Sequence, residues 1–285
     1  MKAALWARLR NARYALPGWV ERHFAGPDAA AAAQVAAGLE QRGIAATLGY
    51  FQASTGSAAT IEAANVAALA TMSGHHTYLS VKSPPLGHDP ARLARIADAA
   101  KLVGTTILFD AHAPKDATPT LALLDRLLPD HPGTGCVIPA RWGRSAADVA
   151  RLRDSTARIR VVKGEWADPD WSGDIAAAYL GLVRQLAGRA APVAVATHHP
   201  PLAEAALALL RQAGTPCELE QLRGLPGRAT ARVAARLGVP VRVYIPFGPG
   251  WWPYAIDQAL ARPWLPLWAM RDFIAAPSTS LQSGR

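Results

Sequence analysis

Cysteines and long apolar stretches are what this sequence most clearly lacks. Only two cysteines, Cys136 and Cys217, occur in 285 residues, which is too few for a structural zinc site. Both fall inside separate predicted strands, so we expect small buried residues rather than a disulfide. No apolar run reaches the roughly 18 to 20 residues that cross a bilayer, and no uninterrupted apolar segment follows the first basic residues as in a secretory signal. The sequence therefore predicts a soluble, cytoplasmic protein without a transmembrane segment.

Lysine is also scarce. The net charge is +9, but the 30 basic residues include only five lysines, and the arginines are scattered over predicted helices and loops. A nucleic-acid surface needs a clustered basic stripe, so we expect no nucleic acid among the partners. No Gly-x-Gly-x-x-Gly precedes a predicted helix and no segment reads His-Glu-x-x-His. A Rossmann-type dinucleotide site and a metallopeptidase helix are therefore not indicated.

The sequence does contain a repeated alternation of short β-branched runs and Ala/Leu/Arg-rich segments. The second kind shows helical periodicity, as in residues 90–102, 145–152 and 201–213. Strand–helix alternation repeated eight times is the pattern of a closed (β/α)8 TIM-type barrel, an α/β fold. We expect a helical N-terminal extension over residues 1–43, the barrel over 44–275 and a disordered tail over 276–285. The predicted strands are residues 45–51, 77–82, 106–110, 135–139, 159–163, 192–197, 216–221 and 241–246.

Most predicted strands end on a polar side chain. In a (β/α)8 barrel the carboxyl ends of the strands face one mouth, where the chemistry takes place. These ends carry two lysines, several arginines and two to four histidines, so we expect an electropositive mouth that suits an anionic ligand. The candidates are Lys82, Asp110, His112, Arg160, Lys163, His198, His199 and Glu220.

One interpretation of these strand ends is a metal-dependent enzyme. Carboxylate and imidazole ligands suit zinc, manganese or iron. Against this interpretation, the first strand offers no His-x-His pair, and two strand-end lysines would repel the ion. The metal ligands in this alternative are Asp110, His112, His198 and Glu220.

Six strand-end segments, taken in chain order, carry a family resemblance. They are residues 77–83, 109–111, 158–164, 196–198, 216–224 and 241–248. They resemble the proline dehydrogenase family of FAD-dependent (β/α)8 barrels, and the match runs over about residues 49–253. The segment around Arg160 is the most similar, with Arg158-Ile-Arg160-Val-Val-Lys163-Gly164 against the family's Arg-x-Arg-Leu-Val-Lys-Gly-Ala-Tyr.

The resemblance implies a reaction and a set of roles. The family transfers a hydride from the carbon beside an amine nitrogen to flavin N5, and the flavin carries the redox chemistry. By resemblance, the catalytic residues are Lys82, Asp110 and Arg160. The FAD-binding residues are Arg160, Lys163, Gly164, Thr197, His198 and Glu220, with Thr197 and His198 toward the ribityl–phosphate portion. The substrate-binding residues are Trp166, Tyr244, Tyr254 and Asp257.

The sequence departs from the family at the substrate end. The paired arginines that hold the proline carboxylate in the family are absent, and Tyr254-Ala-Ile-Asp257 stands in their place. Losing two charged hydrogen bonds removes roughly 1.5 to 3 kcal/mol each from carboxylate binding. We therefore expect an amine substrate other than free L-proline, with Arg141 or Arg223 as a relocated carboxylate anchor or Asp257 as a partner for a cationic amine. Further departures from the family are His112, Pro139, Trp166, His199 and Glu220.

A third interpretation is a barrel that kept its core and lost its redox activity. Such a relative would bind another ligand or a partner, and exposed tryptophans often anchor partners. The same tryptophans also suit a C-terminal helix packed over the barrel. The cluster in question is Trp251, Trp252, Trp264 and Trp268.

Overall fold

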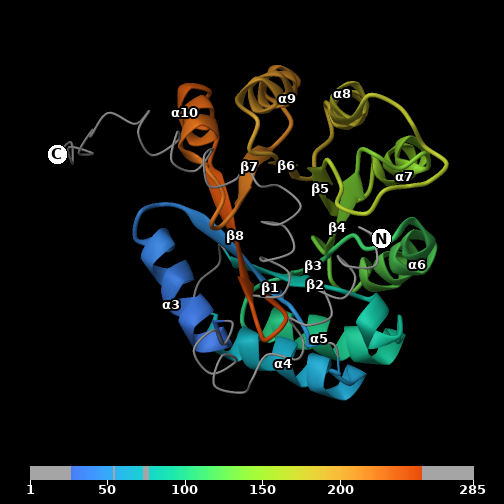
Figure 1. Cartoon of the computed structure of the whole chain (residues 1–285), viewed down its shortest axis with the longest axis vertical. Coiled ribbons are helices and arrows are strands. Elements are labelled where there is room, and N and C mark those ends of the chain that lie inside the picture. The colour runs from blue at the N-terminus through green and yellow to red at the C-terminus, as the bar shows by residue number, and fades with distance from the viewer. Residues whose placement is uncertain (1–26, 54, 73–76, 252–285) are drawn as a thin grey trace, which may run out of the picture.

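The computed structural model describes residues 27–53, 55–72 and 77–251. Eight parallel strands form a closed barrel in sequence order, with β8 paired to β1 (Figure 1). The closed parallel barrel predicted from the alternation is confirmed. The strands are β1 (Ala45–Tyr50), β2 (Thr77–Val81), β3 (Ile107–Phe109), β4 (Gly135–Pro139), β5 (Arg158–Val162), β6 (Val193–Ala196), β7 (Cys217–Leu222) and β8 (Val241–Phe247).

Helices lie around the outside of the strands (Figure 1). Several begin at a side chain that accepts a hydrogen bond from a free backbone N–H of the first turn, as Asp89 and Asp174 do. The helices are α3 (Ala29–Glu40), α4 (Ala58–Thr71), α5 (Pro90–Leu102), α6 (Ala117–Leu127), α7 (Ser145–Leu152), α8 (Ile175–Leu186), α9 (Pro200–Gln212) and α10 (Arg228–Arg236). Two short 3-10 helices, η2 (Pro84–Leu86) and η3 (Pro114–Asp116), precede α5 and α6.

The predicted domain boundaries stay predictions. Of the N-terminal extension, residues 1–26 lie outside the described part, and α3 packs against β1, β8 and α4. The tail over residues 276–285 also lies outside it. Cys136 is buried and Cys217 is partly buried, and neither forms a disulfide. No helix among the described residues is long and apolar enough to span a membrane.

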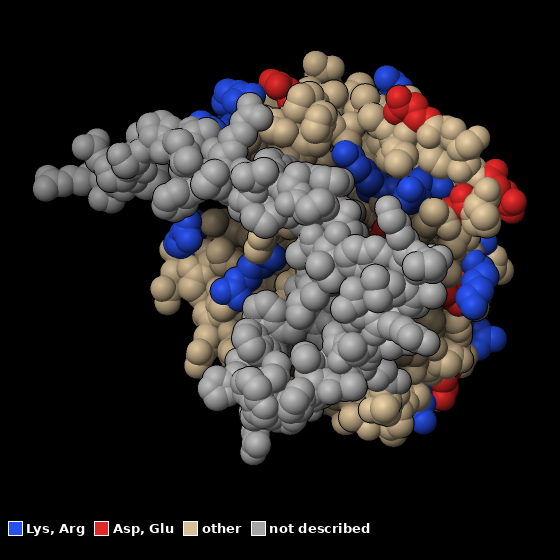
Figure 2. Space-filling view, viewed as in Figure 1, with Lys and Arg blue, Asp and Glu red and all other residues tan. Residues whose placement is uncertain are grey.

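Charge is spread over the surface. Figure 2 shows basic side chains distributed around the visible part of one face, with acidic side chains between them. Arg189, in contrast, is buried at the end of the barrel where the strands begin. It donates hydrogen bonds to four carbonyl oxygens around the end of α7, namely those of Leu152, Arg153, Ser155 and Ala157. This arginine therefore fixes the turn between α7 and β5.

The barrel interior holds a buried ionic cluster below the mouth. Arg158 and Arg242 both bind the Glu218 carboxylate, and all three residues are buried. Both guanidinium groups lie over the Tyr78 ring, with carbon-to-centroid distances of 4.6 and 4.2 Å. Arg242 also donates to the Ala46 carbonyl oxygen. Among the described residues, two arginines thus share the Glu218 carboxylate.

Candidate active site

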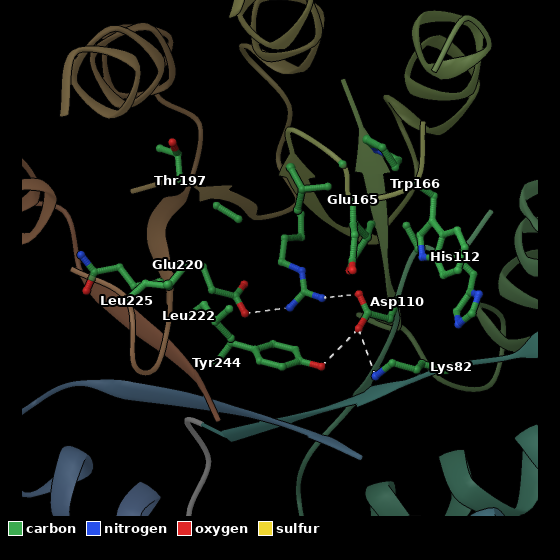
Figure 3. A pocket seen from close by; sticks show the side chains of 18 of the residues that line it. Lys82, Asp110, His112, Glu165, Trp166, Thr197, Glu220, Leu222, Leu225 and Tyr244 are labelled. Carbon is green, nitrogen blue, oxygen red and sulfur yellow. Dashed lines mark hydrogen bonds and ion pairs between the residues drawn. The ribbon is translucent and has the colours of Figure 1, made fainter. Parts of the chain in front are cut away.

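A cavity of about 530 Å³ opens at the carboxyl ends of the strands. This size lies within the range of about 300 to 1,000 Å³ typical of small-molecule sites. Every strand, or the segment directly after it, contributes residues to it, as expected for a (β/α)8 active site. Its apolar walls include Phe51, Val137, Val162, Leu222 and Leu225. Figure 3 shows the polar residues gathered on its floor.

The guanidinium group of Arg160 lies between the carboxylates of Asp110 and Glu220. Its Nη1 donates to Oε1 of Glu220 at 2.8 Å, and its Nη2 donates to Oδ1 of Asp110 at 2.9 Å. Arg160 and Glu220 are only 4% and 2% exposed. Charged hydrogen bonds in such a dry environment are strong, so Arg160 is held in one position.

Asp110, directly after β3, also contacts side chains from β8 and from the end of β2. Its Oδ2 accepts a hydrogen bond from the Tyr244 hydroxyl at 3.2 Å and lies 3.5 Å from the Lys82 Nζ. Lys82 in turn donates to the Tyr50 carbonyl oxygen at 3.1 Å, and its Nζ lies 3.9 Å from the centre of the Phe51 ring. Both charged side chains are therefore fixed by several contacts each.

The network keeps its carboxylates ionised. Burial alone would raise the pKa of Asp110, but the charges of Arg160 and Lys82 outweigh burial and hold that pKa below its ordinary value. The pKa of Glu220 is likewise lowered, because Arg160, Arg158 and Arg242 outweigh the cost of burial. Burial lowers the pKa of Lys82, an effect that Asp110 partly offsets.

Negative charge slightly exceeds positive charge in the described cavity. Two cationic residues, Lys82 and Arg160, line it together with three carboxylates, Asp110, Glu165 and Glu220. The expectation of an electropositive mouth is therefore wrong for the described residues. It counted the lysines and arginines but not the acids that pair with them.

The loop after β5 is tied to the end of β4. Arg141 donates to the carbonyl oxygens of Gly164 and Glu165, and the Trp142 Nε1–H donates to that of Trp166 at 2.8 Å. Gly164 has φ +95°, and a Cβ there would lie 2.8 Å from the Pro139 Cβ. Glycine is therefore required at this position.

Two rings stack at the rim of the cavity. The imidazole of His112 and the indole of Trp166 lie 5.2 Å apart at an angle of 23°. Burial and the neighbouring charge of Lys82 lower the pKa of His112, so its ring is neutral at pH 7. The structure thus brings the predicted substrate residue Trp166 into the site beside His112.

Most of the predicted site residues line this one cavity. They are Lys82, Asp110, Arg160, Gly164, Trp166, Thr197, His198, Glu220 and Tyr244. Lys163 is exposed and does not line it, because neighbouring positions along a strand alternate between the two faces and Arg160 and Val162 point inward. Tyr254, Asp257, Trp252, Trp264 and Trp268 lie outside the described residues.

His198 uses both ring nitrogens within the protein. Its Nδ1 lies 2.7 Å from the Pro226 carbonyl oxygen, which only accepts, and its Nε2 accepts from the Leu222 N–H at 2.9 Å. These contacts define a neutral ring with the proton on Nδ1. Neither nitrogen is then available for a phosphate. Thr197 lies beside it, and its hydroxyl oxygen accepts from the His199 N–H at 3.1 Å.

The same contacts bear on the metal interpretation. Among the described residues, no group of three or more His, Cys, Asp or Glu side chains is placed to hold a metal ion. The guanidinium of Arg160 lies between Asp110 and Glu220, and the ring nitrogens of His198 are engaged. These side chains therefore form an ion-pair network and not a ligand set.

Neither proposed carboxylate anchor reaches the cavity. Arg141 binds the backbone of the β5–α8 loop, and Arg223 is exposed. Sequence reasoning also missed Glu165 and Trp142, which line the cavity. Glu165 directly follows the conspicuous Lys163-Gly164 pair, so its position in the sequence offered a signal. Trp142 lies three residues beyond β4 and gave none.

Comparisons with known proteins agree with the pattern of the strand ends. Proline dehydrogenase 1 of Bacillus subtilis subsp. natto is 26% identical over 264 residues, which cover 85% of this chain and 86% of that protein. Proline dehydrogenase 1 of Bacillus subtilis strain 168 gives the same identity and coverage. No family model matches the sequence.

Two solved structures share the fold. Proline utilization A from Bdellovibrio bacteriovorus, inactivated by N-propargylglycine, has a TM-score of 0.73 and 17% identity over 88% of this chain. Proline utilization A from Corynebacterium freiburgense has a TM-score of 0.68 and 18% identity over 99% of it. The matches cover 33% and 35% of those longer chains. The resemblance to the proline dehydrogenase family that the strand-end segments carry is thus confirmed by sequence relatives that match most of this chain, and the solved structures share its barrel fold.

Proposed function

We propose that this proline dehydrogenase-like oxidoreductase is an FAD-dependent enzyme that oxidises an amine other than free L-proline. In the reaction, the substrate loses a hydride from the carbon next to nitrogen and a proton from the nitrogen, and the amine becomes an imine. The observation that carries the proposal is the Arg160 site. A fixed, buried guanidinium at the mouth of the barrel is flanked by carboxylates and apolar walls, in a chain related to proline dehydrogenases.

The described residues fit a flavin. Two buried atoms of cavity-lining side chains, the Arg160 Nε–H donor and the Glu220 Oε2 acceptor, lack a hydrogen-bond partner within the described part of the chain. A flavin ring has apolar faces and carries both N–H and C=O groups along one edge, so its chemistry suits these atoms and the apolar walls. Arg160, Gly164, Thr197 and Glu220 are the residues that would hold it.

The flavin, when bound, supplies the hydride acceptor. The chain supplies placement and charge. The two carboxylates hold Arg160 in one orientation, and Tyr244 packs with its ring centre 5.1 Å from the guanidinium carbon. The apolar walls exclude water from the floor of the site. A preorganised charge of this kind needs no reorientation when charge shifts during the reaction.

The substrate assignment rests on the cations of the cavity. Lys82 is the only lysine and Arg160 the only arginine among the described residues that line the cavity. Both side chains are already paired with carboxylates. A free carboxylate on the substrate would have to compete with Asp110 and Glu220 for them. The absence of the family's paired arginines from the sequence points the same way.

Absorbance of the purified protein tests the cofactor. A yellow protein with a flavin band at about 450 nm is expected. A colourless protein that cannot be reconstituted with FAD overturns the proposal. Anaerobic addition of L-proline then tests the substrate. We expect slow or no bleaching with millimolar L-proline and faster bleaching with a cyclic amine that lacks the carboxylate. Rapid bleaching by L-proline contradicts the altered substrate.

A further inference from the structure

Gly49 is a buried glycine near the end of β1. Glycine is unfavourable inside a strand, because it has no side chain to pack, and its presence there often marks a close approach by another group. Gly49 does not have the positive φ that requires glycine at Gly164. The reason for a glycine at this position is therefore the space above it and not its backbone conformation.

The space above Gly49 is filled by the side chain of Tyr244 from β8. Tyr244 pairs with Thr47 of β1, and Gly49 lies two residues further toward the mouth of the barrel on the same face. A Cβ on Gly49 would overlap the hydroxyl group and Cζ of Tyr244 and would lie 3.0 Å from its Cε1. The Tyr244 ring and a side chain at position 49 therefore cannot occupy the barrel together without a shift of the ring.

The position of the Tyr244 ring bears on the charged centre of the site. Its hydroxyl donates to Oδ2 of Asp110 at 3.2 Å, toward which it points in Figure 3. Its ring centre lies 5.1 Å from the guanidinium carbon of Arg160. The ring also lines the cavity, so a side chain on Gly49 would displace it into the cavity and take the hydroxyl away from Asp110.

We propose that Gly49 is a positioning residue for the reaction, because the missing side chain lets Tyr244 reach Asp110 across the end of β1. The inference rests on the proposed function in taking this cavity as the place where the amine is oxidised. Gly49 does not itself line the cavity and acts through Tyr244. Asp110 also binds Arg160 and Lys82, so the placement of Tyr244 affects the carboxylate that joins both cations.

NMR of the Tyr244 ring tests the placement without any substrate. The chain has six tyrosines, and labelling their Cζ atoms with 13C gives one resonance for each ring. The resonance that disappears in Tyr244→Phe belongs to Tyr244. In Gly49→Ala we expect this resonance to move toward its position in the unfolded chain, because the hydrogen bond to Asp110 is lost. An unchanged resonance in folded Gly49→Ala overturns the inference.

Gly135→Ala is the matched control. Gly135 begins β4, at the opposite end of the barrel from the cavity, and a Cβ there would lie 2.7 Å from the carbonyl oxygen of Arg158. This variant therefore also crowds a strand, but it should leave the Tyr244 resonance unchanged. If Gly135→Ala moves that resonance as far as Gly49→Ala does, the ring responds to any disturbance of the barrel and the inference is overturned.

A compensating variant covers the case in which Gly49→Ala does not fold. Leucine at position 244 has none of the three atoms that the new Cβ would meet. Overpacking predicts that Gly49→Ala alone lowers the melting temperature by about 2 to 12 °C. The same substitution made in Tyr244→Leu should change the melting temperature little, and a double variant that falls by the full amount overturns the inference.

Flavin bleaching links the placement to the reaction. Pyrrolidine is the probe amine, and its oxidation transfers a hydride from the carbon next to nitrogen to the flavin, releases the nitrogen proton and gives 1-pyrroline. Gly49→Ala should slow anaerobic bleaching about tenfold to a hundredfold, the effect of one hydrogen bond to a charged group. Tyr244→Leu and the double variant should be equally slow, because both glycine and tyrosine act at one place. Independent slowing by the two substitutions overturns the inference.

Absorbance of the same samples separates the two proposals. A yellow protein whose Tyr244 resonance ignores Gly49→Ala overturns the inference and leaves the proposed function intact. A colourless protein that cannot be reconstituted, but whose resonance moves, overturns the proposed function and leaves Gly49 as the residue that places Tyr244. If the protein is yellow and pyrrolidine does not bleach it, the resonance and the melting temperatures decide.

Discussion

Replacing Arg160 by methionine removes the cation from the centre of the site while keeping a side chain of similar length. The change leaves the carboxylates of Asp110 and Glu220 buried without the partner that binds them at 2.9 and 2.8 Å. Removing one partner from a buried ion pair destabilises a protein by about 3 to 5 kcal/mol. For a chain of this size we expect the melting temperature to fall by roughly 6 to 20 °C.

A double-mutant cycle isolates the interaction with Glu220. Urea unfolding, followed by circular dichroism, is measured for the wild type, Arg160→Met, Glu220→Gln and the double variant. Because Glu220→Gln removes one of the stranded charges, the double variant should recover about 1.5 to 3 kcal/mol relative to additivity. Arg151→Met breaks an exposed pair with Asp125 and should cost about 0 to 1 kcal/mol. If Arg160→Met costs no more than this control, or the cycle is additive, the buried network does not hold the site together.

Three further outcomes follow from the described contacts. Gly164→Ala should lower the free energy of unfolding by about 1 to 3 kcal/mol and weaken flavin binding, because φ is +95° and the new Cβ would meet Pro139. Thermal unfolding measures the first effect and a flavin titration measures the second. Arg189→Met should lower the free energy of unfolding, measured in urea, by about 3 to 5 kcal/mol, because four carbonyl oxygens lose their hydrogen-bond donor. Ligand binding in the cavity should stay unchanged, and a changed Kd would contradict this separation. Burial lowers the pKa of His112, so the unfolded state takes up its proton first, and the free energy of unfolding should fall as pH drops below about 6.5; His112→Asn should remove this part of the slope.

The sequence predicted the barrel well because its elements are regular. The ranges predicted for two helices, residues 90–102 and 145–152, coincide with α5 and α7. The strand predictions deviate mainly at their ends, as at β3, where residues 106–110 were predicted and Ile107–Phe109 is observed. A strand ends where its ladder pairing ends, and pairing depends on neighbours that a local pattern does not contain.

The candidate site was predicted less completely than the barrel. The position of Lys163 outside the cavity follows from the alternation of side chains along a strand once Arg160 is taken as inward. Sequence alone could have supplied that result. The engagement of His198 could not be predicted, because its partners, Pro226 and Leu222, come from the segment around the end of β7. The charge of the mouth was misjudged for the same reason, since ion pairing is a tertiary property.

The ionic cluster below the cavity has a consequence for how this barrel folds. Arg158, Glu218 and Arg242 come from the second half of the chain, whereas the Tyr78 ring and the Ala46 carbonyl that complete their surroundings come from the first. A fragment containing only β5–β8 would keep the ion pairs with Glu218 but lose the Tyr78 ring and the Ala46 carbonyl oxygen that complete their surroundings. The two halves are therefore not independent folding units, and refolding should be cooperative across the seam between β8 and β1.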